Sequence, residues 1–124
     1  MAVFRPQKRV CTLNFDDKFT YEVPLTDDFA FRLDDAKERL NRVSPTDRAG
    51  IDAAYNTALD IIDDLLGAGA SDDIMSLFAN PGSVEVMEVF LYIVEEWKNA
   101  YAAVVENVSK TIPAPNRAER RARR

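Results

Sequence analysis

The stretch from Val84 to Lys110 constrains the fold of this 124-residue chain most strongly, because it contains neither proline nor glycine. Such a stretch predicts one long helix over 83–110, with Ser83 as its N-cap. At 1.5 Å per residue this helix would be about 41 Å long, whereas a compact domain of this size has a diameter of about 35 Å. We therefore expect the helix to protrude from the domain.

This helix carries two adjoining apolar stripes where an ordinary surface helix carries one. One stripe comprises Val84, Met87, Leu91, Val94, Tyr101, Val105 and Val108, and the other comprises Val86, Val89, Phe90, Ile93, Trp97, Ala100 and Val104. So wide an apolar arc needs cover on more than one flank, either within the domain core or by a partner. For the second possibility, we predict a partner-binding surface and self-association through Phe90, Ile93, Trp97, Tyr101 and Val104.

Two short runs of alternating apolar residues precede the helical part of the chain and predict a β-hairpin over 9–23. The apolar positions of both runs are odd-numbered, so they share one face if Phe15 lies opposite Phe19, with a turn over 16–18. A third strand around Val3 and Phe4 is a further possibility, at the edge of the sheet because of Pro6.

Three further helices are predicted between the hairpin and the long helix, over 26–43, 45–66 and 71–79. Their expected N-caps are Thr26, Ser44 and Ser71. The fold class is therefore α+β and mainly α: an N-terminal β-hairpin followed by a small helical bundle with one long C-terminal helix. We expect a single domain over 1–112 and a flexible basic tail over 113–124.

The residues that most enzymes use are missing or poorly arranged. The chain has no histidine and one cysteine, Cys11, which excludes histidine bases, histidine metal ligands and an internal disulfide. Adjacent carboxylates on a helix point about 100° apart and do not converge on one proton. Asp60 with Asp63 or Asp64 could share a helical face and hold a cation, but a solvated polar face is the interpretation that we prefer. We expect no catalytic residue, no cofactor and no bound metal.

Charge is divided unevenly between the body and the C-terminal end. Residues 117–124 carry five arginines and one glutamate, so the total of −5 leaves −9 on residues 1–116. The basic residues are Arg117, Arg120, Arg121, Arg123 and Arg124. They could serve as a docking peptide or simply as a solvated end. Because the body is acidic and no aromatic residue interleaves the tail, we do not expect nucleic acid to be the principal partner.

No signal peptide and no run of 18 uncharged apolar residues is present in the sequence. We therefore expect a cytoplasmic protein without a membrane partner.

The layout as a whole resembles the tail assembly chaperones of long-tailed bacteriophages. The resemblance rests on an N-terminal hairpin, an acidic helical body and the basic end over 116–124, whose sequence is NRAERRARR. It implies a protein that binds the apolar tape-measure protein in the bacterial cytoplasm and keeps it soluble during tail assembly. Alternatives are another phage structural or connector component, or a small regulator that uses the basic tail on nucleic acid.

Overall fold

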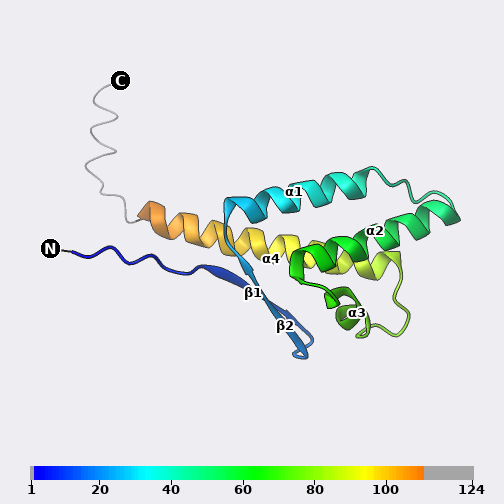
Figure 1. Cartoon of the computed structure of the whole chain (residues 1–124), viewed down its shortest axis with the longest axis horizontal. Coiled ribbons are helices and arrows are strands. Elements are labelled where there is room, and N and C mark those ends of the chain that lie inside the picture. The colour runs from blue at the N-terminus through cyan, green and yellow to red at the C-terminus, as the bar shows by residue number, and fades with distance from the viewer. Residues whose placement is uncertain (1, 111–124) are drawn as a thin grey trace, which may run out of the picture.

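The computed structural model describes residues 2–110 and confirms the predicted fold class. Within these residues, strands β1 (Val10–Phe15) and β2 (Phe19–Pro24) form a hairpin, and four helices follow it. The helices are α1 (Asp27–Asn41), α2 (Arg48–Leu66), α3 (Ala70–Met75) and α4 (Ser83–Lys110). Figure 1 shows α4 along the long axis of the molecule, with its C-terminal end extending beyond the start of α1. The long helix thus protrudes, as its length predicts.

The hairpin has the register that the alternating pattern predicts, with Phe15 opposite Phe19. Its turn places Asp16 and Asp17 in the left-handed region, at φ 55° and 56°, which aspartate tolerates better than most residues. The side chain of Asn14 stabilises this turn by accepting a hydrogen bond from the Asp17 N–H at 2.9 Å. Residues 2–9 form no strand, so the third strand considered around Val3 and Phe4 is absent.

One face of the hairpin is buried against α4. Cys11, Leu13, Phe15 and Val23 are buried, and the Phe15 ring meets Tyr92 of α4 edge to face with ring centroids 5.1 Å apart. Since an isolated hairpin is marginal in water, the packing of β1 on α4 and of β2 on α2 stabilises these two strands.

Helix α1 begins as predicted and ends two residues early. The Thr26 hydroxyl accepts a hydrogen bond from the Phe29 N–H at 3.2 Å, which satisfies one of the free donors of the first turn. At the other end the Arg42 N–H bonds to the Glu38 carbonyl, and Arg42 is the C-cap. Helix α1 buries Phe29, Leu33 and Ala36 from its predicted stripe.

The N-terminus of α2 corrects the predicted start at 45. Asp47, not Ser44, is the N-cap, and its carboxylate accepts a hydrogen bond from the Gly50 N–H at 2.7 Å. Both residue types cap well, so the choice depends on the path of the loop that leads in from α1. This loop runs so close to α2 that the Ser44 carbonyl occupies the space next to the Gly50 Cα.

Helix α3 is shorter than the predicted 71–79 and begins one residue earlier. Gly69 occupies the N-cap position with φ 86°, a left-handed conformation that favours glycine. The expected cap, Ser71, is instead buried within the helix, and its N–H donates to the Asp63 carboxylate at 2.8 Å. A side chain from the end of α2 therefore satisfies a donor at the start of α3.

All these elements contribute to one core. α2 and β1 pack on α4, while α1 and α3 pack on α2. The largest fully buried side chains come from both strands and all four helices within 2–110: Leu13, Val23, Phe29, Ile61, Ile62, Ile74, Val86 and Ile93.

We predict that Gly50→Ala destabilises the fold by about 1–3 kcal/mol, because the new methyl group would overlap the Ser44 carbonyl oxygen. The midpoint of urea unfolding measures the loss. Gly82→Ala is the matched control: its methyl group would lie 3.6 Å from the nearest side-chain atom, on Glu85, and should change stability by less than about 0.5 kcal/mol. Equal midpoints for the two variants would contradict the close approach of the loop to α2.

Candidate functional site

Three of the residues predicted to bind a partner lie in the core. Phe90, Ile93 and Trp97 are buried, with only 5% of Trp97 exposed. The Trp97 indole N–H donates to the Pro24 carbonyl at the end of β2, at 2.9 Å, and its ring packs near that of Phe29. The hairpin and the start of α1 therefore cover the surface that was expected to be open around Trp97, and these three side chains are not accessible to a partner.

The other two predicted residues, Tyr101 and Val104, lie beyond this cover and are partly exposed. The Tyr101 ring stacks on Trp97 with ring centroids 4.9 Å apart. Both residues line a groove of about 290 Å³, whose other residues are Arg9, Leu25, Asp27, Val105, Val108 and Ser109. The accessible part of the predicted surface is thus the groove between the C-terminal half of α4 and the β2–α1 junction.

A second apolar groove, of about 430 Å³, lies beside the N-terminal half of α4. From α4 it is lined by Ser83, Val84, Met87, Glu88 and Leu91, and opposite them by Leu40, Asn41, Val43, Pro45 and Ala54. Val84 and Leu91 are large apolar side chains with 65% and 55% of their surfaces exposed. Such exposure marks a surface available to a partner.

Two lysines meet between these grooves. The side chain of Lys98 of α4 lies beside that of Lys37 of α1 and lowers the pKa of Lys37, because only the neutral Lys37 amine can accept a hydrogen bond from the Lys98 ammonium group. Partial burial and repulsion between the two ammonium groups act in the same direction, while nearby Asp34 acts against them. A carboxylate placed beside the two lysines would relieve this repulsion.

The two grooves and the lysine lie along one row of α4, which we term the α4 seam. It comprises Val84, Met87, Leu91, Val94, Lys98, Tyr101, Val105 and Val108. Successive members are alternately three and four residues apart, the spacing of a and d positions in a coiled coil. Val105 and Val108 are 46% and 45% exposed, so the seam exposes apolar side chains toward both of its ends, whereas Val94 near its middle is buried with 5% exposed.

No protein family model, curated protein or solved structure matches this chain.

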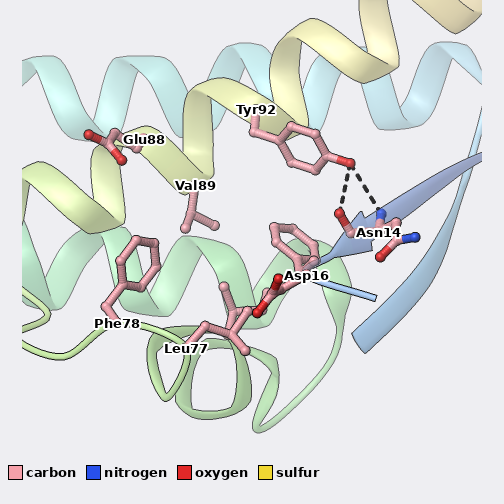
Figure 2. A pocket seen from close by; sticks show the side chains of 9 residues that line it. Asn14, Asp16, Leu77, Phe78, Glu88, Val89 and Tyr92 are labelled. Carbon is pink, nitrogen blue, oxygen red and sulfur yellow. Dashed lines mark hydrogen bonds between the residues drawn. The ribbon is translucent and has the colours of Figure 1, made fainter. Parts of the chain in front are cut away.

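A third pocket, of about 380 Å³, lies between β1, the end of α3 and α4 (Figure 2). Its lining is mainly apolar and includes Phe78 and Val89, with the carboxylates of Asp16 and Glu88 also present. At its edge the Tyr92 hydroxyl donates to the Asn14 carbonyl at 3.0 Å and accepts from the Asn14 N–H at 3.1 Å. This hydroxyl therefore fastens the hairpin to α4, and both of its hydrogen bonds go to backbone groups.

The acidic residues at the end of α2 have structural contacts. Asp63 binds the Ser71 N–H, and the Asp64 carboxylate lies 3.0 Å from the Arg39 guanidinium. Arg32 also donates to the Asp64 carbonyl. Over residues 2–110, no group of three or more His, Cys, Asp or Glu side chains is arranged to hold a metal ion.

Two further expectations concern the basic C-terminal tail and the absence of a membrane-spanning helix. The basic tail with its five arginines lies outside the described residues. Among the helices of 2–110, none is long and apolar enough to cross a membrane.

The thiol of Cys11 is buried on the inner face of the hairpin, where 4% of the residue is exposed. Burial raises the pKa of this thiol, and the negative charge of Glu96 raises it further. The reactive thiolate is therefore disfavoured in the folded protein.

We predict that Cys11 reacts slowly with a thiol reagent in the folded protein and rapidly in concentrated urea. Burial should slow the reaction by about 100-fold or more relative to the unfolded chain. A colorimetric disulfide reagent at mildly alkaline pH measures both rates. Equal rates would show that the hairpin face is open to solvent.

Proposed function

We propose that this protein is a non-enzymatic phage tail assembly chaperone that binds an apolar helical segment of the tape-measure protein along the α4 seam. The overall layout supports this proposal through its resemblance to that family. The proposal also implies that the protein acts in the cytoplasm of the bacterial host.

The exposure of the α4 seam is the observation that carries the proposal. From Val84 to Val108 the seam is about 36 Å long at 1.5 Å per residue. Exposed apolar side chains occur near both ends and within it, namely Val84, Leu91, Val105 and Val108. A helical client with apolar residues at the same repeat would place its side chains between those of the seam.

The grooves beside the seam give such a client a defined place. Each groove has walls from α4 and from elements outside it, so a client helix would contact more than one helix of the chaperone. Lys37 and Lys98 lie between the grooves and favour a client with an acidic residue near the middle of its apolar stripe. Binding would thus combine apolar burial at both ends with charge recognition at the centre.

Co-expression with a tape-measure fragment tests this function, with the soluble fraction of the fragment as the measurement. The wild-type chain should raise that fraction, and Leu91→Asp or Val105→Asp should abolish the gain by placing a charge in the apolar contact. Ala103→Asp is the matched control, because it adds the same side chain at an exposed position of α4 outside the seam.

Circular dichroism should show folded protein for all three variants, since each substitution lies at an exposed position. An insoluble fragment in the presence of the wild-type chain would contradict the proposed function. A gain that survives both seam substitutions would move the client site away from the α4 seam.

A further inference from the structure

The N-terminal arm, which we define as residues 2–9, carries two large apolar side chains that a single copy leaves uncovered. Val3 and Phe4 are 72% and 87% exposed, more than any other large apolar residue of 2–110. The arm also contains three basic residues, Arg5, Lys8 and Arg9, and no acidic one. It therefore combines an apolar anchor with positive charge, and a surface that receives it should be apolar with a negative rim.

The arm is held away from the body of its own copy. The Arg9 carbonyl accepts a hydrogen bond from the Leu25 N–H at 3.2 Å, which continues the pairing of β1 and β2 by one residue. Pro6 fixes its own φ and keeps the preceding residue extended, so the middle of the arm is stiff. Figure 1 shows the arm running away from the hairpin turn.

The pocket between β1, the end of α3 and α4 has the character that the arm requires. It has a volume of about 380 Å³, and its buried apolar residues are Phe15, Ile74 and Val89. Its charged lining residues are the exposed Asp16, from the hairpin turn, and the exposed Glu88, from α4 (Figure 2). No basic residue lines this pocket. The pocket is thus apolar inside and negative at its rim.

Further carboxylates make the surroundings of this pocket negative. The Tyr21 ring packs edge to face on Phe15, with ring centroids 5.9 Å apart. Burial raises the pKa of Tyr21, and the negative charges of Asp73 and Asp63 raise it further. A basic segment is therefore attracted to this side of the molecule.

We propose that the N-terminal arm of one copy occupies this pocket on a second copy, with Phe4 among the apolar side chains and Arg5 beside the carboxylates of Asp16 and Glu88. The contact covers the most exposed aromatic ring of residues 2–110. It also pairs the basic arm with the negative rim. Because each copy has one arm and one pocket, a two-fold dimer fills both pockets.

A copy's own arm is poorly placed to fill its own pocket. The arm leaves the hairpin at Val10, whereas the pocket lies at the turn end, beside Phe15. These two residues are about 17 Å apart along β1 at 3.4 Å per residue. The arm would have to reverse its direction and break the hydrogen bond between Arg9 and Leu25.

The other basic segment and the other grooves match less well. In the C-terminal segment 111–124, four residues separate the large apolar residue Ile112 from the first arginine, so anchor and charge are not adjacent. The groove beside Tyr101 contains Arg9, and a groove of about 270 Å³ between α1 and α2 contains Arg32 and Arg39. Those arginines would repel a basic arm.

The dimer does not rest on the client proposed above, and it leaves the exposed Leu91 and Val105 of the α4 seam uncovered. The two proposals fail separately, since the dimer is measured on the purified chain alone and client binding by co-expression.

Sedimentation equilibrium of the full chain tests the association. The wild type should be a dimer at micromolar concentration. Phe4→Asp should raise the dissociation constant by about 100-fold or more, because two-fold symmetry removes the anchor from both contacts. Phe31→Asp is the matched control: it makes the same change at a position of α1 that is 64% exposed, and should leave the dissociation constant unchanged. A monomeric wild type, or a dimer that Phe4→Asp does not weaken, would overturn the proposal.

Neutral substitutions at the rim test the role of charge. Asp16→Asn with Glu88→Gln should weaken the dimer by about fivefold or more, because the two carboxylates that face Arg5 are lost from both contacts. Asparagine also tolerates the left-handed backbone of position 16. Asp52→Asn with Glu95→Gln is the control, at exposed positions outside the pocket. Equal dissociation constants for the two double variants would show that the rim does not bind the arm.

Paramagnetic broadening tests whether the arm reaches a second copy. A chain with Ala2→Cys carries a nitroxide spin label on the arm and is mixed with an isotope-labelled wild-type chain. The native Cys11 is buried and should stay unlabelled. The label should broaden the amide signals of Leu77 and Val89 in the wild-type copy, and not those of Tyr101. Unchanged signals at Leu77 and Val89 would place the arm outside this pocket and overturn the proposal.

Discussion

The position of Trp97 determines how the other elements are arranged. Its indole N–H holds the last residue of β2, Pro24, and its ring packs against Phe29 in the first turn of α1. One side chain of α4 thus joins the hairpin to α1 at the point where the chain passes from one to the other. The indole is large, apolar and a hydrogen-bond donor, and this site uses all three properties. Without it, the carbonyl of Pro24 would be left without its partner beside the core.

Most of the fold was predictable because local signals and burial agree in this chain. The alternating residues Leu13 and Phe15 indicate a strand face, and the structure buries them. Thr26 caps α1 as expected, and α2 ends at the predicted residue 66 with Gly67 as its C-cap, since capping depends on neighbouring residues. The incorrect predictions concern helix starts whose position depends on contacts with other parts of the chain. Asp47 caps α2 because of the path of the preceding loop, and the Asp63 carboxylate binds Ser71 within α3.

Three of the five residues predicted to bind a partner belong to the stripe of α4 that the core buries. Two apolar stripes adjoin each other on α4, and periodicity alone does not say which one meets the hairpin. The stripe containing Phe90, Ile93 and Trp97 is buried, whereas members of the other, such as Leu91 and Val105, are exposed. The alternating spacing of three and four residues along that second stripe was a usable signal. Lys98 interrupts its apolar pattern, and the proximity of Lys37 becomes visible only in three dimensions.

The hairpin is fastened to α4 at two points, by Tyr92 at the turn end and by Trp97 at the exit of β2. Opening β1 therefore breaks the bonds to Tyr92, and opening β2 breaks the bond to Trp97, so each strand of the hairpin is joined to the first half of α4. Beyond Tyr101 the helix borders a groove whose other wall includes Leu25, Asp27 and Arg9, and Val105 and Val108 are exposed. α4 is one continuous helix, but we expect local opening to cost more free energy in its first half than in its last turns. Amide hydrogen exchange should therefore be slow along its first half and fast over its last turns, where local opening costs little free energy.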